Sequence, residues 1–142
     1  LDMFAGSGAL AIEALSRGAS HAWLVEKSTL ALQTLQNNLI CCSCLDHAEV
    51  IRGDLWKVMP RVKSAAPFDL IFIDPPYNRG LAIKAIQVIE QTGLLAVEGI
   101  ASVETDASES LPEQLGSLGR IEQRRYGSTL LHFYQVKPEE NP

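Results

Sequence analysis

The sequence predicts an α/β fold built on an open, mainly parallel sheet with helices on both faces. Three features predict it. Strand-like apolar runs alternate with helical segments along most of the chain, a pattern typical of parallel sheets. The run Phe68 to Ile73 is mostly apolar, as expected for a strand covered on both faces. Finally, Gly127-Ser128 joins two strand-like runs near the C-terminal end, which predicts an antiparallel hairpin.

The first half of the chain is expected to alternate between strand and helix. Helical spacing places Leu10, Ala14 and Leu15 on one side of the first helix, and Gly18 ends that helix as a C-terminal cap. Ser28 is the expected cap of the second helix. The elements expected here are the tail of a strand at Leu1 to Phe4, a helix at Ala9 to Arg17, a strand at Ala22 to Val25, a helix from Ser28 to about Ile40, a strand at Ala48 to Ile51 and a short helix around Leu55 to Met59.

The second half begins with the strand Phe68 to Ile73 and ends in the predicted hairpin. Between them we expect a helix from about Leu81 to Gln91, a strand at Leu94 to Glu104 and a short helix at Ser110 to Gly116, and the hairpin strands are Arg120 to Tyr126 and Thr129 to Val136. Residues 1–136 are expected to form one domain, followed by a disordered tail, Lys137 to Pro142.

Composition places the chain among soluble globular proteins. Of its 142 residues, 46% are hydrophobic and 20% are charged. No apolar run approaches the ~20 residues of a membrane helix, no signal-peptide pattern is present, and we expect a cytoplasmic location. The net charge of −5 argues against a tight autonomous nucleic-acid binder, although a local basic rim is compatible with it. Because the chain opens on Leu1 inside a predicted strand, we expect it to be a fragment lacking an N-terminal part.

A cysteine cluster lies where the second helix is expected to end. Cys41 and Cys44 have the C-x-x-C spacing, with Cys42 between them and His47 close by. A structural metal site usually needs about four ligands, arranged as two separated pairs. The sequence offers no second pair, so we interpret the cysteines as small apolar residues in a reducing compartment and predict no metal.

The first candidate site is the glycine loop, Asp2 to Gly8. Its glycines permit a tight turn and close approach of a ligand, and backbone N–H groups at the following helix N-terminus favour a negatively charged group. The run Gly6-Ser7-Gly8-Ala9-Leu10-Ala11 also satisfies a relaxed dinucleotide fingerprint. A nicotinamide-dependent enzyme, and a tight turn without any ligand, therefore stay open at this point.

Two carboxylates follow the next strands. Glu26 stands 20 residues after Gly6, where a carboxylate can accept hydrogen bonds from both hydroxyls of a ribose. Asp54 could accept a hydrogen bond from an adenine amino group, or cap the helix that starts at Leu55. The candidate cofactor-binding residues are Asp2, Phe4, Ala5, Gly6, Ser7, Gly8, Glu26, Lys27, Asp54 and Leu55.

The second candidate site is the run Asp74-Pro75-Pro76-Tyr77, directly after the buried strand. Each residue before a proline is held in an extended conformation, and neither proline has an N–H. The Asp74 carboxylate and the Pro75 carbonyl can therefore both accept hydrogen bonds from one amino group. An exocyclic base amine needs such partners, because its lone pair is delocalised into the ring. Tyr77 can stack on the base, a contact worth roughly 1–3 kcal/mol.

The Asp-Pro-Pro-Tyr run and the Phe-Ala-Gly-Ser-Gly loop resemble the amino-methylating branch of the Rossmann-like methyltransferases. The stretch from Leu1 to Ala19 is similar to the bacterial 16S rRNA guanine-N2 methyltransferases of the RsmD type. This resemblance implies a Rossmann-like, mainly parallel seven-stranded sheet that ends in an antiparallel hairpin. It also implies methyl transfer from S-adenosyl-L-methionine to the N2 amine of a guanine in 16S rRNA.

The resemblance implies roles for particular residues and partners. Asp74, Pro75, Pro76 and Tyr77 would be catalytic, and Tyr77 and Arg79 would contact the substrate. The expected partner is 16S rRNA in the small ribosomal subunit or its assembly intermediate, bound by a monomer without a membrane. Other base amines, adenine N6 or cytosine N4, stay open, and a nicotinamide-dependent oxidoreductase would leave Asp74 to Tyr77 without a role. Further basic residues that could form a rim are Arg120, Arg124 and Arg125.

Overall fold

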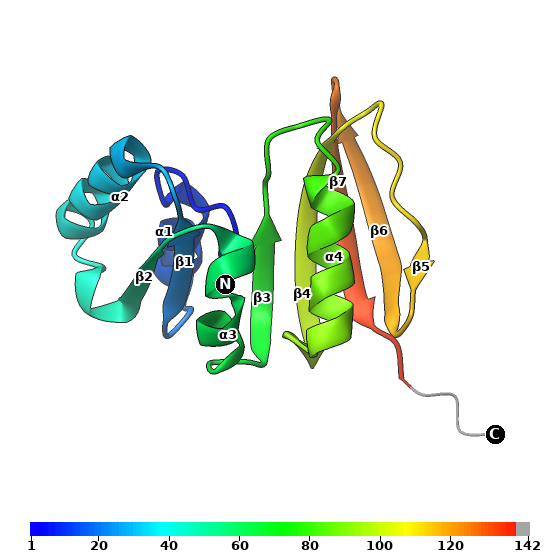
Figure 1. Ribbon diagram of the computed structural model, residues 1–142, viewed down its shortest axis with the longest axis horizontal. Coiled ribbons are helices and arrows are strands. Elements are labelled where there is room, and N and C mark those ends of the chain that lie inside the picture. The colour runs from blue at the N-terminus through cyan, green and yellow to red at the C-terminus, as the bar shows by residue number, and fades with distance from the viewer. Residues whose placement is uncertain (139–142) are drawn as a thin grey trace. The chain divides into compact units, whose positions relative to one another are not determined.

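A computed structural model describes residues 1–138. The chain divides into two compact units, Leu1–Ser64 and Ala65–Pro142. Figure 1 shows the elements of each unit along the chain. None of the helices in the described part of the chain is long and apolar enough to cross a membrane. Of the predicted tail, residues 139–142 lie outside the described residues. Lys137 is held to the second unit, because its backbone N–H donates to the Ser117 carbonyl at 2.8 Å.

The first unit alternates helix and strand as predicted. Its elements are α1 (Ala9–Ser16), β1 (Ala22–Glu26), α2 (Thr29–Cys41), a 3₁₀ helix η1 (Leu45–His47), β2 (Ala48–Arg52) and α3 (Leu55–Lys63). Strands β1 and β2 are parallel, with Ala22 opposite Ala48 and Glu26 opposite Arg52. The predicted strand at Leu1 to Phe4 is reduced to a single parallel bridge between Asp2 and Leu24.

The core of the first unit forms where α1 and α2 pack against β1. Leu24 of β1 and Leu35 and Leu39 of α2 are completely buried there, together with Ala11 of α1. Burying large aliphatic side chains of this kind contributes about 1.5–3 kcal/mol each. The Ser28 hydroxyl accepts a hydrogen bond from the Ala31 N–H at 3.3 Å, so the predicted cap of α2 is confirmed.

The second unit is a mixed five-stranded sheet. Its elements are β3 (Phe68–Ile73), α4 (Leu81–Thr92), β4 (Leu95–Asp106), β5 (Gln114–Leu115), β6 (Leu118–Tyr126) and β7 (Thr129–Val136). The strand order is β3-β4-β7-β6-β5. Only the β3–β4 pair is parallel, whereas β4–β7, β7–β6 and β6–β5 are antiparallel. In Figure 1, α4 lies in front of the sheet over β4, and it contacts β4 and β5.

Two predictions for the second unit are corrected by these pairings. The sheet is mixed rather than mainly parallel, because the confirmed β6–β7 hairpin enters it antiparallel to β4. The described strands pair as one two-stranded and one five-stranded sheet, not as a seven-stranded sheet. The short helix predicted at Ser110 to Gly116 is also wrong, since this segment is irregular and ends in the two-residue strand β5. Its backbone carbonyls bond to side chains of the hairpin instead of to a helix.

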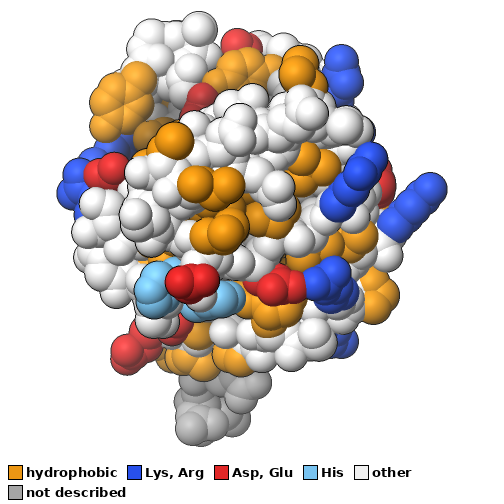
Figure 2. Space-filling view, turned by 90° about the vertical axis from the view of Figure 1, so that its left-hand side faces the viewer, with side chains coloured by type: hydrophobic (Ala, Val, Ile, Leu, Met, Phe, Trp, Pro, Cys, Tyr) orange, Lys and Arg blue, Asp and Glu red, His pale blue; other side chains and the backbone are white. Residues whose placement is uncertain are grey.

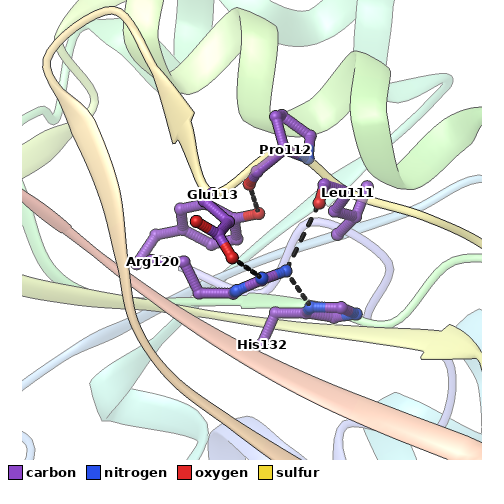
Figure 3. A network of polar contacts seen from close by, with 6 residues as sticks. Leu111, Pro112, Glu113, Arg120 and His132 are labelled. Carbon is purple, nitrogen blue, oxygen red and sulfur yellow. Dashed lines mark hydrogen bonds and ion pairs between the residues drawn. The ribbon is translucent and has the colours of Figure 1, made fainter.

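Figure 3 shows the network that holds this segment. Arg120 of β6 donates to the Leu111 carbonyl at 3.3 Å and to Nδ1 of His132 at 3.4 Å. The Tyr134 hydroxyl donates to the Pro112 carbonyl at 2.5 Å. Because arginine can only donate, Nδ1 of His132 accepts, and its Nε2 donates to the Thr105 hydroxyl at 3.0 Å. The segment before β5 is thus bonded to β6 and β7.

Candidate functional site

The glycine loop of the first unit depends on its glycines in two different ways. Gly6 and Gly8 have φ angles of +54° and +83°, which L side chains rarely adopt. A Cβ at Gly8 would stand 3.3 Å from the Leu35 side chain, whereas one at Gly6 would meet nothing within 4 Å. Gly8 therefore allows α1 to begin against the core. Gly6 leaves the loop open on its outer side, where a ligand can approach the backbone.

The carboxylate of Glu26 lies against this loop. One of its oxygens accepts a hydrogen bond from the Gly6 N–H at 2.7 Å, and the other accepts from the N–H groups of Lys27 and Ser28, both at 2.8 Å. Glu26 ends β1 and is partly exposed. The structure thus brings together Gly6 and Glu26, which the sequence separates by 20 residues. These backbone donors occupy three of the roughly four acceptor sites of the carboxylate, and the oxygen bonded to Gly6 keeps a lone pair that can accept from a ribose hydroxyl.

Asp54 acts as a helix cap in this structure. Its carboxylate accepts a hydrogen bond from the Trp56 N–H at 3.1 Å, at the start of α3, so the capping interpretation is confirmed. Leu55 is buried and Lys27 is exposed. The capped Asp54 retains its second oxygen, and its role toward an adenine stays a prediction.

Sequence reasoning missed two residues around the loop. The Asn38 side chain of α2 donates to the Ser7 carbonyl at 2.9 Å, and the Trp56 ring meets Phe4 edge-on with centroids 6.3 Å apart. Asp2 is buried, and its carboxylate accepts a hydrogen bond from the Phe4 N–H at 3.3 Å. Helical spacing marks Asn38 as an ordinary position of α2, so no local signal points to the loop.

In the second unit, Asp74 leaves β3 beside a second carboxylate. Ile73, the last residue of β3, lies opposite Val103 of β4, so the next residues along the parallel strands, Asp74 and Glu104, are neighbours. Desolvation, and then the nearby charge of Glu104, raise the pKa of Asp74 above its ordinary value. The structure therefore gives Asp74 an acidic neighbour that the sequence analysis did not name.

Tyr77 also contacts Glu104. The Tyr77 hydroxyl donates a hydrogen bond to the Glu104 carboxylate. This hydrogen bond is the main reason why the pKa of Tyr77 is raised, against an opposing contribution from Thr129. The side chain is 37% exposed, which leaves part of the ring free to contact another molecule. Pro75 is buried and Pro76 is exposed.

The residue after Tyr77 is fixed by the turn that follows β4. Asn78 has a φ of +57°, and its backbone N–H donates to the Glu109 carboxylate at 2.6 Å. The Ser108 hydroxyl lies 3.2 Å from the Asn78 side-chain oxygen and 2.5 Å from the Asp106 carboxylate. Arg79 is exposed. Residues 74–78 are thus bordered by side chains of β4 and of the turn after it.

The expected basic rim is only partly available. The guanidinium of Arg120 points into the second unit, where its side chain is 17% exposed, so Arg120 is not a rim residue. Arg124 pairs with Glu122 at 2.5 Å and lies 5.6 Å from the centroid of the Phe133 ring. Arg125 donates to the Gly127 carbonyl at 2.9 Å. On the face drawn in Figure 2, Lys and Arg side chains are scattered among acidic and apolar ones.

The cysteine cluster contains free thiols. Cys41 and Cys42 are exposed, and Cys44 packs against the core of the first unit. Within residues 1–138, no group of three or more His, Cys, Asp and Glu side chains is placed to hold a metal ion.

Comparison with known proteins identifies the family. A family described as conserved hypothetical protein 95 matches residues 1–135. A putative rRNA methyltransferase, YlbH of Bacillus subtilis, is 36% identical over 138 residues, which cover 96% of this chain and 75% of that protein. Ribosomal RNA small subunit methyltransferase D of Escherichia coli is 33% identical over 135 residues, which cover 95% of this chain and 67% of that protein.

Solved structures agree with the sequence relatives. A conserved hypothetical protein from Streptococcus pyogenes has a TM-score of 0.85 at 32% identity, covering 99% of this chain and 86% of its own. The putative methyltransferase yhhF from Escherichia coli has a TM-score of 0.81 at 33% identity, covering 96% and 74%. An RNA methyltransferase from Salinibacter ruber, in complex with S-adenosyl-L-homocysteine, shares the fold with a TM-score of 0.64 at 14% identity, covering 99% and 81%. The chain therefore belongs to the conserved hypothetical protein 95 family, that of the ribosomal RNA small subunit methyltransferases D, and is a methyltransferase with an α/β fold.

Proposed function

We propose that this protein transfers a methyl group from S-adenosyl-L-methionine to the exocyclic N2 amine of a guanine in 16S rRNA. The family relationship supports rRNA methylation, since the relative from Escherichia coli is named for small-subunit ribosomal RNA. One structural observation carries the choice of acceptor. Asp74 directly follows β3 beside Glu104, and the prolines that follow Asp74 have no N–H to donate.

The first unit would bind the cofactor. When bound, S-adenosyl-L-methionine supplies an electrophilic methyl group. The open outer side of Gly6 would admit the ligand to the loop, and Glu26 would accept hydrogen bonds from its ribose hydroxyls. Structures solved with S-adenosyl-L-homocysteine share this fold, which favours this cofactor over a nicotinamide. A nicotinamide enzyme would also leave the run from Asp74 to Tyr77 without a role.

The second unit would orient the amine. A base amine is a poor nucleophile, because its lone pair is delocalised into the ring. The Asp74 carboxylate and the Pro75 carbonyl would each accept a hydrogen bond from one N–H of the amine. These two bonds would orient the nitrogen lone pair toward the methyl group. Tyr77 would stack on the base, which must leave its helix to enter the site. Catalysis would then come mainly from positioning and electrostatics.

The acidic surroundings support guanine among the possible bases. Guanine presents two adjacent donors, its N1–H and its N2 amine, whereas adenine and cytosine present a ring acceptor beside the amine. The described carboxylates around this run include those of Asp74, which directly follows β3, and of Glu109, which accepts from the Asn78 N–H. Such acceptors suit an edge made of donors and disfavour one that also carries an acceptor.

The substrate would be rRNA inside a ribonucleoprotein particle. The net charge of −5 provides little general attraction for RNA. Specificity would then come from a folded surface that presents one flipped guanine, as in the small subunit or its assembly intermediate. We further propose that the enzyme acts in the cytoplasm as a monomer.

The decisive experiment compares substrates and maps the modified base. Undermethylated 30S subunits, naked 16S rRNA and DNA would each be incubated with the full-length protein and labelled S-adenosyl-L-methionine. We expect N2-methylguanine in the particle, and less product on naked rRNA. A product at adenine N6 or cytosine N4, or efficient methylation of DNA, would overturn the proposal. Calorimetry should show binding of S-adenosyl-L-homocysteine and not of NAD.

A further inference from the structure

Glu104 lies near the carboxyl end of β4, next to Asp74, the residue proposed to bond to the amine. It lies in β4, is partly buried, and is opposite Leu131 of β7. On the other side of β4, its neighbour is the residue that directly follows β3, Asp74. Strands on both sides therefore fix the backbone of Glu104, and its side chain reaches the loop that follows β3.

Tyr77 has few other means of keeping its orientation. It lies in a loop between β3 and α4, is flanked by exposed residues, Pro76 and Asn78, and is itself 37% exposed. An exposed tyrosine on such a loop would populate several rotamers. The hydrogen bond from its hydroxyl to the Glu104 carboxylate selects one of them.

We propose that Glu104 is a positioning residue for methyl transfer, which holds the Tyr77 ring in the orientation that stacks on the target base. This inference rests on the proposed function, because it assumes that Tyr77 contacts the base. Glu104 itself need not touch the substrate. Its contribution is to order the ring before the substrate arrives, so that binding the base does not have to immobilise it.

A second tether supports this interpretation. The Asn78 N–H donates to Glu109 at 2.6 Å, which fixes the backbone on the far side of Tyr77. The turn that carries Glu109 is itself anchored two residues further on, where the Leu111 carbonyl accepts from Arg120. The loop backbone and the Tyr77 ring are therefore held separately: Glu109 acts on the backbone, whereas Glu104, with a further side-chain hydrogen bond from Thr129, acts on the hydroxyl of the ring.

The expected size of the effect follows from the cost of ordering a side chain. Immobilising one flexible side chain on binding lowers affinity or rate by about 3- to 10-fold. Glu104→Ala should therefore reduce kcat/KM on the particle by about this factor. Glu104→Gln should restore most of the rate, because its amide oxygen can still accept from the Tyr77 hydroxyl. The Gln variant also removes the negative charge beside Asp74, so rescue would separate the hydrogen bond from the charge.

A double-mutant cycle tests the mechanism. The experiment compares the full-length wild type, Glu104→Ala, Tyr77→Phe and the double variant on 30S subunits, with S-adenosyl-L-homocysteine binding measured in parallel. Tyr77→Phe keeps the ring and removes the hydroxyl, so Glu104→Ala should have almost no further effect in that background. Glu98→Ala, which removes an exposed carboxylate of the same strand, β4, is the matched control and should retain wild-type activity.

The outcomes separate this inference from the proposed function. If Glu104→Ala and Tyr77→Phe reduce the rate by independent factors that multiply, Glu104 does not act through Tyr77. A Gln variant as slow as the Ala variant would also overturn the proposal. If Glu104→Ala fails to fold, the Gln variant is compared with the wild type instead, and a loss by the full factor of about 3 to 10 in the Gln variant would overturn the proposal. In either case the wild type would still methylate the particle. A wild type that fails to methylate guanine N2 would instead overturn the proposed function.

Discussion

The glycine loop and the run from Asp74 to Tyr77, here called the acceptor run because it would hold the methyl-accepting amine, are stabilised in different ways. In the first unit, the Glu26 carboxylate bonds to three backbone N–H groups, two of them from the residues directly after it. In the second unit, Tyr77 and Asn78 bond to carboxylate side chains that lie 27 and 31 residues further along the chain. The first arrangement uses backbone groups that every sequence supplies, whereas the second depends on particular distant side chains.

This difference predicts different responses to substitution. A backbone donor persists when its own side chain changes, so the glycine loop should tolerate changes that preserve Glu26, the two glycines and Asn38, whose side chain donates to the Ser7 carbonyl. The acceptor run should be sensitive to single changes at residues such as Glu104, well outside the run itself. Methyl transfer should accordingly be easier to damage from a distance than cofactor binding.

The largest expected effect is at Asp74. Asp74→Ala removes one of the two proposed acceptors for the amine, and loss of a preorganised catalytic partner typically reduces kcat about 100- to 1,000-fold. Affinity for S-adenosyl-L-homocysteine should stay within about twofold, within the usual range for a change away from a binding site. The measurements are single-turnover methylation and calorimetry. Asp69→Ala, at an exposed position of the same strand, should behave as the wild type.

A contrary result for Asp74 would break the comparison. If Asp74→Ala weakened cofactor binding as strongly as it slowed methylation, cofactor and acceptor functions would not be divided between the two sets of residues. Retained methylation in a folded variant would remove Asp74 from the acceptor role.

The next largest effect is expected at Glu26. Glu26→Ala removes the proposed partner of the ribose hydroxyls and also the acceptor for the Gly6 N–H. Hydrogen bonds to charged groups contribute about 1.5–3 kcal/mol, so affinity for S-adenosyl-L-homocysteine should fall roughly 10- to 100-fold. Glu13→Ala removes an exposed carboxylate of α1 and should leave the affinity unchanged. Equal affinities for the Glu26 variant and the wild type would place the ribose elsewhere.

The glycine loop was the more predictable of the two regions. The expected position of Glu26, at the end of a strand and 20 residues after Gly6, agrees with the hydrogen bond between them. Parallel strands bring their carboxyl ends to one edge, so this contact follows from the order of the elements. Glu104 obeys the same rule, because the sequence predicted a strand that ends there. The rule placed it correctly, but nothing in the sequence near Glu104 pairs it with Tyr77.

The segment between β4 and β6 was not predictable from local sequence. The pattern of Ser110 to Gly116 suggested a short helix, and Arg120 suggested an exposed rim. In the structure, the Leu111 carbonyl accepts from Arg120 and the Pro112 carbonyl accepts from Tyr134. These bonds replace the helical ones and bury the guanidinium. The outcome depends on a tertiary contact with the hairpin, which neither propensity nor charge encodes.

A smaller effect is expected from pH, through His132. Burial and then the charge of Arg120 lower the pKa of His132 below its ordinary 6.5, while Glu109 opposes them. The unfolded chain therefore takes up a proton near pH 6.5 that the folded protein does not. Stability contributed by neutral His132 is present above pH 6.5 and is lost as pH falls toward the lower, folded pKa. The slope can reach about 1.4 kcal/mol per pH unit.

Urea unfolding between pH 7.5 and pH 5 would measure this slope. His132→Gln should lower the free energy of unfolding at pH 7.5, because it disrupts the contacts with Thr105 and Arg120, but it should flatten the dependence on pH. His47→Gln, at an exposed position of the first unit, should keep the wild-type slope. An unchanged slope in the His132 variant would show that other groups cause the acid sensitivity. A flattened slope would show that the acid sensitivity arises at His132, in the second unit.

The smallest effect is expected at Arg79, and it tests whether the acceptor run has any electrostatic hold on RNA. Arg79 is exposed and lies two residues after Tyr77, the residue proposed to stack on the flipped base. Loss of one phosphate contact weakens binding to every RNA sequence. It also makes the slope of log K against the logarithm of the salt concentration shallower by about one. Arg79→Glu should therefore raise KM for the particle several-fold at low salt, leave kcat unchanged, and approach the wild type as salt increases. Lys63→Glu, at an exposed position of α3, is the control for a general change in charge.

If both variants shift KM equally, the effect comes from net charge. If Arg79→Glu lowers kcat and its ratio to the wild type does not change with salt, Arg79 helps to shape the acceptor run, and that run would then depend on a cation as well as on its carboxylates.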